Sequence, residues 1–306
     1  MDYFLPPVFR GESFDHMPAN ANWGMDLFGV DYLRSRNPKP IKVGVIDTGI
    51  DDTHPLIAPV FKGAWDFTGS RHGYRDANGH GTHCSGTMAG IDPRMGVAAG
   101  FELYHGKGLS DSGSGSTSSL INAMNRCIEE GCKVLSCSWG GGGYSASDER
   151  EYRRMDDAGV LLVAAAGNSG PNTGNTDYPG RYPYFINVAA LGRDMLPASF
   201  TSAGDKIDTS WAGVNIRSAQ ANTGRYVDMS GTSMACPGEG GLLALFISIR
   251  MELGLPWLNA DAMRKVLFDR STDTHLPGDD RRTGPGWSTP ALLELALTPP
   301  PMPLEV

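Results

Sequence analysis

Five runs of mainly apolar residues recur along the chain, and each ends in or is followed by glycine or polar residues. They are residues 41–49, 101–107, 133–139, 160–167 and 184–191. Runs of this length with such ends are typical of buried strands. Stretches with helical spacing alternate with them, at residues 79–90, 118–131, 146–159 and 233–252. The alternation predicts an α/β fold with three layers, in which a mostly parallel sheet is flanked by helices.

The two ends of the chain differ from its middle. We expect an N-terminal extension over residues 1–21, one α/β domain over residues 22–296, and a proline-rich tail or linker over residues 297–306. A short amphipathic stretch, residues 23–34, opens the domain. No internal repeat is visible, so the sequence predicts one domain rather than an array.

Composition and charge exclude several classes of protein. The net charge of −8 argues against a general nucleic-acid binder, which would show a basic face. No apolar run reaches the roughly 18 residues of a membrane span, so no membrane partner is expected. The five cysteines form no CxxC pair, which suits neither zinc nor an iron–sulfur cluster and indicates buried free thiols. Because no secretory signal is visible either, we expect a cytoplasmic protein, unless the chain is a fragment of a larger or secreted precursor; the oligomeric state stays open.

Three segments place a reactive side chain beside glycine and small residues. Asp47 follows a predicted strand, whereas His80 and Ser233 each open a predicted helix. A serine hydroxyl becomes a nucleophile when a histidine takes its proton, and a buried carboxylate holds that histidine in the right tautomer. Taken singly, the segments also suit a strand-end turn, a capped helix with a surface histidine, and a helix N-cap. All three in one chain favour a catalytic triad without a metal.

The motifs around these residues resemble those of the subtilisin-like serine proteases, the subtilases. They are VIDTG (45–49) with HP following (54–55), HGTHCSGT (80–87), AAGN (165–168) and GTSMACP (231–237). The likeness covers roughly residues 22–296 and is nearest in character to intracellular-type members. It implies that Asp47 orients His80, that His80 is the general base and then acid, that Ser233 is the nucleophile, and that Asn168 donates to the oxyanion. It also implies a serine endopeptidase that acts on polypeptides through an acyl-enzyme and requires no cofactor.

The same resemblance implies a set of substrate-binding residues, with one edge strand, an opposite wall and the floor of the S1 pocket. They are Gly113, Ser114, Gly115, Ser138, Trp139, Gly140, Ala165, Gly167 and Asp177. Residues 113–115 taken alone would also suit a flexible linker. Asp177 has two interpretations. At the base of S1 it favours Arg or Lys at P1, the substrate residue whose carbonyl is attacked; otherwise it turns outward, or only caps the loop at residues 172–176.

The chain departs from the subtilase pattern in three places. The helix after the nucleophile reads CPGEGG (236–241) and lacks the usual histidine. Leu56 stands where an acidic calcium ligand is usual, and the loop at residues 91–95 is short. We therefore expect no calcium site there, although a weak one elsewhere stays possible. We expect no long pro-domain before residue 22; residues 5–7 either lie in the active site as a small inhibitor or belong to an ordinary disordered terminus.

Two rival functions stay open beside hydrolysis. A transpeptidase or macrocyclase would use the same acyl-enzyme, with an amine in place of water as the attacking group. A non-catalytic scaffold would need a lost triad residue, and none is lost. Cys84, four residues after His80, should share its helix face and lie beneath the catalytic imidazole, which the resemblance supports. The resemblance further implies that the Tyr178–Pro179 bond is cis.

Overall fold

A seven-stranded sheet forms the centre of the computed structural model, which describes residues 2–15, 22–172 and 174–288. The strand order is β11-β10-β9-β7-β3-β5-β4, and every pair in it is parallel. The five predicted runs supply its middle: β3 (Lys42–Asp47), β5 (Glu102–Lys107), β7 (Val134–Cys137), β9 (Leu161–Ala165) and β10 (Phe185–Leu191). The sequence pattern missed the two outer strands, β4 (Phe61–Asp66) and β11 (Thr209–Ala212), which lack long apolar runs.

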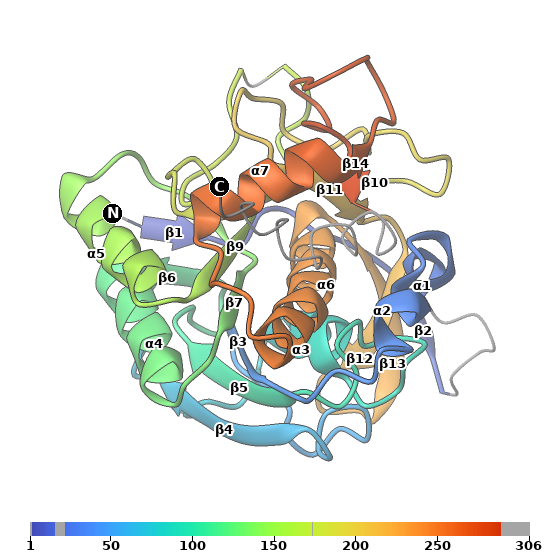
Figure 1. Ribbon diagram of the computed structural model, residues 1–306. Coiled ribbons are helices and arrows are strands. Elements are labelled where there is room, and N and C mark those ends of the chain that lie inside the picture. Colours follow the sequence, from blue (N-terminus) through green and yellow to red (C-terminus); the bar gives the residue numbers. More distant parts are fainter. Residues whose placement is uncertain (1, 16–21, 173, 289–306) are drawn as a thin grey trace.

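Helices cover both faces of this sheet, as the predicted layers require (Figure 1). The helices α4 (Thr117–Glu129) and α5 (Ala146–Asp157) pack on one face, where Leu120, Met124 and Tyr152 join an apolar cluster with the sheet. The helices α3 (His80–Ala89) and α6 (Thr232–Glu252) lie on the other face, within a larger cluster. The helix α7 (Ala260–Arg270) adds Met263 and Leu267 to that cluster. The sheet therefore lies between two apolar cores, one on each of its faces.

The helix α6 is the central helix of the larger core. Its length and mean hydropathy of 1.3 would allow it to cross a membrane, yet that apolar stretch is entirely buried inside the protein. Its apolar composition is explained by contacts with α3 and with four strands of the sheet. The helix begins directly after Gly231, so the nucleophile candidate Ser233 lies in its first turn.

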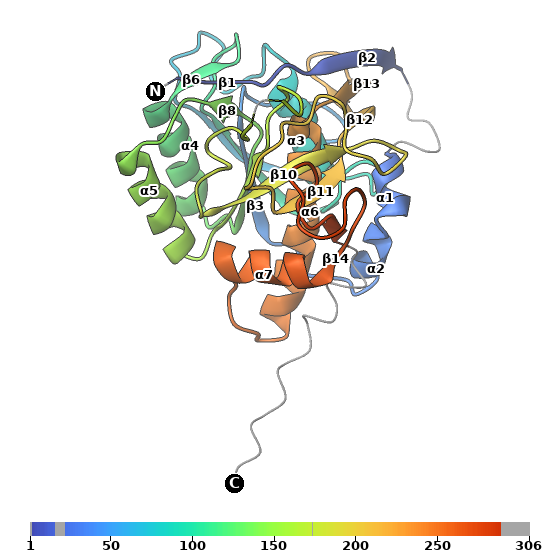
Figure 2. The same cartoon turned by 90° about the horizontal axis from the view of Figure 1, so that it is seen from above.

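The N-terminal extension adds strands to two smaller sheets. The strand β1 (Asp2–Phe4) is the middle strand between β6 (Ser114–Ser116) and β8 (Gly140–Gly141), and β2 (Phe9–Phe14) pairs with β13 (Arg225–Ser230), which pairs with β12 (Ile216–Gln220). Figure 2 shows the extension crossing the molecule from β6 and β8 to β13. A disordered terminus is therefore the wrong interpretation for residues 2–15.

Short elements complete the described chain. The amphipathic stretch forms two helices, α1 (Trp23–Leu27) and α2 (Val30–Arg34), separated at Gly29, whose φ of 65° a helix cannot continue through. The strands β14 (Ser271–Thr272) and β15 (Trp287–Ser288) form a two-stranded sheet after α7. The predicted tail at residues 297–306 and the predicted domain end at residue 296 lie outside the described residues.

Candidate active site

The catalytic acid and base candidates meet at the carboxyl edge of the sheet. Asp47 is the last residue of β3, and His80 is the first residue of α3. The Nδ1 atom of His80 lies 2.8 Å from Oδ1 of Asp47, and both side chains are completely buried. Close approach of α3 to the strand end requires Gly81, because a Cβ there would lie 2.3 Å from the carbonyl oxygen of Gly49. The Asp47 carboxylate thus fixes the ring and leaves Nε2 available for proton transfer.

Ser233 lies in the same site, but its hydroxyl points to a different partner. Its Oγ donates a hydrogen bond to the carbonyl oxygen of Ser138 at 3.2 Å. The Nε2 atom of His80 is buried and has no hydrogen-bond partner among the described residues. In turn, Oγ of Ser138 donates to the carbonyl oxygen of Ser233 at 2.9 Å. The structure therefore brings the three triad candidates together without the bond between nucleophile and base.

Asn168 presents its amide nitrogen to the cleft. Its Oδ1 accepts hydrogen bonds from the backbone N–H of Thr232 at 2.9 Å and from the Thr232 hydroxyl at 2.8 Å. These two bonds orient the side chain so that Nδ2 points away from α6. There Nδ2 donates to the carbonyl oxygen of Pro7 at 2.8 Å. A peptide carbonyl of the extension therefore occupies the position expected for a substrate carbonyl.

The predicted edge strand and the opposite wall both pair with the extension. Tyr3 of β1 lies opposite Gly115 on β6 and Gly141 on β8, and the backbone N–H of Leu5 donates to the carbonyl oxygen of Gly113 at 2.9 Å. The Tyr3 ring packs edge-on against Trp139, with ring centroids 4.9 Å apart. Residues 113–115 are thus a strand edge and not a linker.

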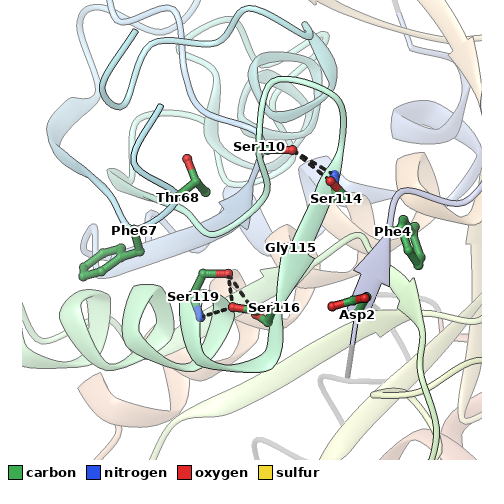
Figure 3. A pocket seen from close by; sticks show the side chains of 9 residues that line it. All are labelled: Asp2, Phe4, Phe67, Thr68, Ser110, Ser114, Gly115, Ser116 and Ser119. Atoms are coloured by element: carbon green, nitrogen blue, oxygen red, sulfur yellow. Dashed lines mark hydrogen bonds between the residues drawn. The ribbon is translucent and has the colours of Figure 1, made fainter. Parts of the chain in front are cut away.

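Figure 3 shows the outer side of this edge strand. Asp2 and Phe4 of β1 lie beside β6, at a pocket that Phe67 and Thr68 also line. The side chain of Phe4 is 53% exposed, whereas Tyr3 is fully buried. Successive side chains of β1 therefore point alternately to the buried and the exposed face of the strand, as strand geometry requires.

Comparison with known proteins agrees with this geometry. The model of the subtilase family matches residues 39–286. A thermostable alkaline protease of Halalkalibacterium halodurans is 37% identical over 228 residues, which cover 73% of this chain and 62% of that protein. Subtilisin DY of Bacillus licheniformis is 35% identical over 272 residues, covering 86% of this chain and 95% of that protein. Subtilisin E of Bacillus subtilis is 36% identical over 241 residues, covering 77% of this chain and 61% of that protein.

The chain belongs to the subtilase family. The matched part spans about three-fifths of the alkaline protease and of subtilisin E, and nearly all of subtilisin DY. The family match includes the segments that carry Asp47, His80, Asn168 and Ser233. In this subtilase the four residues lie at one edge of the sheet, so their proximity does not rest on the resemblance alone.

Asp177 of this subtilase lies against Gly140 and Gly167 and does not turn outward. A Cβ on Gly167 would lie 2.4 Å from Oδ2 of Asp177, and a Cβ on Gly140 would lie 2.8 Å from its Cβ. The Asp177 backbone N–H donates to the carbonyl oxygen of Ala166, next to Ala165 at the end of β9. Burial raises the pKa of the Asp177 carboxyl, and no described residue pairs with it. The Asp177 carboxyl is thus half-buried beside two glycines and without a described partner.

Cys84 lies beneath the imidazole, as the spacing along α3 predicts. Its Sγ is 3.8 Å from Nδ1 of His80 and 3.3 Å from the carbonyl oxygen of Ser233. Asp47, His80 and Cys84 are the one group of described His, Cys, Asp and Glu residues whose ligand atoms lie close enough to hold a metal ion. Burial raises the pKa of the Cys84 thiol well above its usual range. Burial therefore favours the protonated thiol, which donates to the carbonyl oxygen of Ser233.

The position at which subtilases often carry a calcium ligand does not suit calcium in this chain. Leu56 is buried, and a Cβ on Gly90 would lie 2.6 Å from its Cγ. An apolar side chain therefore fills the space beside the 91–95 loop, where calcium would need oxygen ligands. The residues present do not fit the ion at this place.

Sequence reasoning missed two features of the site and left a third as one of two alternatives. The missed features are Thr232, which holds the Asn168 side chain, and the pairing of β13 with β2 of the extension. The alternative that places residues 5–7 in the active site agrees with the contact between Pro7 and Asn168. Thr232 could have been found from the sequence, because it is the middle residue of the GTS motif. The pairing of the extension has no such signal, because it depends on contacts between residues more than a hundred positions apart.

Proposed function

We propose that this subtilase is a serine endopeptidase that hydrolyses polypeptides through an acyl-enzyme. Ser233 Oγ would attack the scissile carbonyl while Nε2 of His80 takes its proton. Asp47 would stabilise the resulting imidazolium, and His80 would return the proton to the leaving amine. Asn168 Nδ2 and the backbone N–H of Ser233 would bind the oxyanion. Water would then release the acyl group and regenerate the enzyme.

One observation gives this proposal its main support. The buried His80–Asp47 pair leaves a single ring nitrogen without a partner, and Ser233 lies in the first turn of α6 at the same site. The buried His83 also has one ring nitrogen without a described partner, but its other nitrogen bonds to the backbone carbonyl of Ile216. His80 differs because its other nitrogen bonds to a carboxylate, which can stabilise the imidazolium. The free nitrogen of His80 supports a proton-transfer role.

The extension occupies the cleft, and we infer that it inhibits the intact chain. Residues 2–5 form backbone pairs with both edges of the proposed substrate groove, and the Pro7 carbonyl accepts a hydrogen bond from the Asn168 amide. A polypeptide substrate would have to displace all these contacts. Removal or release of residues 2–15 would then be the activating step.

We also propose a preference for Arg or Lys at P1, supported by the unpaired carboxylate of Asp177 against Gly140 and Gly167. A basic P1 side chain would provide the missing ion partner in a partly dry pocket, and arginine could do so through two hydrogen bonds. A cytoplasmic location, as for intracellular-type subtilases, is supported by the five cysteines, which are all free and buried.

A fluorophosphonate probe, which reacts with activated serines, tests the proposal. We would label the wild-type chain, a Tyr3→Asp variant in which the extension should be released, and both chains carrying Ser233→Ala. Labelling at Ser233 of either parent, lost in the Ser233→Ala partner, supports a serine hydrolase. Product masses then identify the reaction: addition of water, about 18 Da, means hydrolysis, whereas ligation adds none. If neither folded parent is labelled, the proposal is wrong.

A further inference from the structure

A second completely buried histidine, His105, lies beside the candidate catalytic acid. It belongs to β5, which pairs with β3 so that His105 is the partner of Val45, two residues before Asp47. A Cβ on Gly81 would lie 3.0 Å from Cε1 of His105 and 3.1 Å from Cβ of Asp47. The His105 ring and the Asp47 side chain therefore flank the same point of α3. No step of the proposed mechanism uses this ring.

Both ring nitrogens of His105 have hydrogen-bond partners, and the two partners lie on different segments. Nε2 accepts from the backbone N–H of Gly49 at 3.2 Å, just beyond the end of β3. A backbone N–H always donates, so the proton of the neutral ring is on Nδ1, which lies 3.1 Å from Oγ of Ser85 on α3. Burial lowers the pKa of His105 to about 3, so at neutral pH the ring is neutral and Nε2 stays an acceptor. One ring thus joins the strand that carries Asp47 to the helix that begins at His80.

The bond to Gly49 fixes the backbone that follows the candidate acid. The Gly49 N–H is buried, and a buried N–H without an acceptor would be costly. In the adjoining peptide group, the N–H of Thr48 donates to Oδ1 of Asp47 at 2.7 Å, and Nδ1 of His80 lies 2.8 Å from the same oxygen. The position of this backbone therefore orients the carboxylate that holds the His80 ring.

We propose that His105 is a positioning residue for the acid and the base of the triad. Its Nε2 atom holds the backbone after Asp47, and its Nδ1–H holds α3 through Ser85, so that Asp47 and His80 keep the separation that proton transfer needs. An apolar side chain at position 105 would satisfy neither Gly49 nor Ser85. His105 itself neither contacts substrate nor exchanges a proton in the reaction. The inference rests on the proposed serine-peptidase function.

The test compares two amides at position 105, each of which replaces a different ring nitrogen. His105→Gln extends an amide oxygen to the place of Nε2, where it accepts from Gly49. His105→Asn is one methylene shorter, so its amide reaches the place of Nδ1 beside Ser85 but not Gly49. His83→Gln is the matched control. His83 is also completely buried, and burial lowers its pKa to about 3 as well, but its Nε2 bonds to the carbonyl oxygen of Ile216.

Two quantities are measured on full-length chains whose folding is checked by circular dichroism. The first is the low-field proton resonance of the His80 Nδ1–H group, identified as the signal that a His80→Ala chain lacks. It reports the hydrogen bond to Asp47 and requires no turnover. The second is kcat and KM for an added peptide, measured in chains that also carry Tyr3→Asp.

We expect His105→Asn to displace the His80 resonance and to lower kcat at least about tenfold, with KM nearly unchanged. His105→Gln and His83→Gln should keep the wild-type resonance and a kcat within about threefold of the wild-type value. The inference is wrong if the two variants at position 105 behave alike, or if His83→Gln has the same effect as His105→Asn. It is also wrong if either variant at position 105 fails to fold, because the ring would then serve folding alone. The expected resonances without turnover in any chain would support the role of His105 and contradict the proposed function instead.

Discussion

The side-chain amide of Asn168 donates a 2.8 Å hydrogen bond to the carbonyl oxygen of Pro7, 161 positions away in the sequence. The chain's own extension therefore binds the group that is proposed to stabilise the oxyanion. In subtilisin, removal of such a donor lowers kcat by about 10²–10³-fold. While the Asn168 amide is bonded to the Pro7 carbonyl, it cannot bind the oxyanion of a substrate. Release of the extension and activity should consequently change together.

Replacement of Tyr3 by aspartate should raise activity. Tyr3 is fully buried against Trp139, so a carboxylate there would be desolvated at a cost of about 2 kcal/mol or more. That cost weakens binding of the extension by roughly 30-fold, and we expect at least a tenfold rise in kcat/KM on an added peptide. The control is Phe4→Asp, since Phe4 is 53% exposed. Equal activation by both variants would show that the buried contact does not hold the extension.

Asp177→Asn should remove the preference for basic P1 residues. The Asp177 carboxylate lies against the S1 segments without a partner, so a P1 cation loses its ion pair in the variant. We expect the ratio of kcat/KM for P1 Arg over P1 Phe to fall by about 10²-fold, equivalent to a charged hydrogen-bonded pair of roughly 3 kcal/mol. Matched peptides and Asp261→Asn, an exposed acid on α7, provide the controls. If Phe or Leu is already preferred by the wild type, Asp177 does not set specificity.

Glu239→Gln should stabilise the fold increasingly as pH rises. Glu239 is completely buried in α6, neither carboxylate oxygen has a described partner, and burial raises its pKa from 4.5 to about 8. Between these values the folded chain keeps a proton that the unfolded chain has lost. The free energy of unfolding therefore falls as pH rises through this window, by up to about 1.4 kcal/mol per pH unit, and levels off above it.

Urea unfolding of both chains at pH 5, 6.5 and 8 measures this effect. The advantage of Glu239→Gln over the wild type should grow from pH 5 to pH 8. Glu129→Gln, at an exposed acid of α4, should show no such trend. Parallel stability profiles for the wild type and Glu239→Gln would contradict the prediction.

Chelation with EDTA should leave the melting temperature within about 2 °C of its starting value. Leu56 fills the place of an acidic ligand, and the adjoining loop at residues 91–95 is short. A site occupied at 1,000 times its Kd would add about 4 kcal/mol, which several degrees of melting temperature would reveal. A drop of about ten degrees in melting temperature that CaCl₂ reverses and MgCl₂ does not would demonstrate a calcium site formed by other residues.

Cys84→Ser should retain activity and become resistant to mercurials. The Cys84 sulfur lies 3.8 Å from Nδ1 of His80, so a bulky adduct on it would displace the imidazole. The thiol itself has no part in the proposed chemistry. Activity with and without a mercurial, measured after the extension is released, checks this. Loss of activity in a folded Cys84→Ser chain would assign the thiol a catalytic contribution.

Local sequence determined the parallel sheet and predicted the chemical roles of residues at its edge. The apolar runs at residues 41–49 and 160–167 correspond to β3 and β9, because buried parallel strands need continuous apolar side chains. Asp47, His80 and Ser233 could be assigned together because each is flanked by glycine or small residues at a strand end or helix start. The outer strands β4 and β11 escaped the prediction, since edge strands carry a weaker apolar pattern.

Only the tertiary structure decided the state of the site. Residues 2–15 have no apolar run that indicates a strand; they become strands because β6, β8 and β13 offer unpaired backbone groups to them. The Ser233 hydroxyl donates to the carbonyl oxygen of Ser138, 95 positions away, while Nε2 of His80 has no described partner. The carboxyl of Asp177 likewise lies against Gly140 and Gly167, which leave it room. Residue types are local, whereas the choice of hydrogen-bond partner depends on which segments the fold brings together.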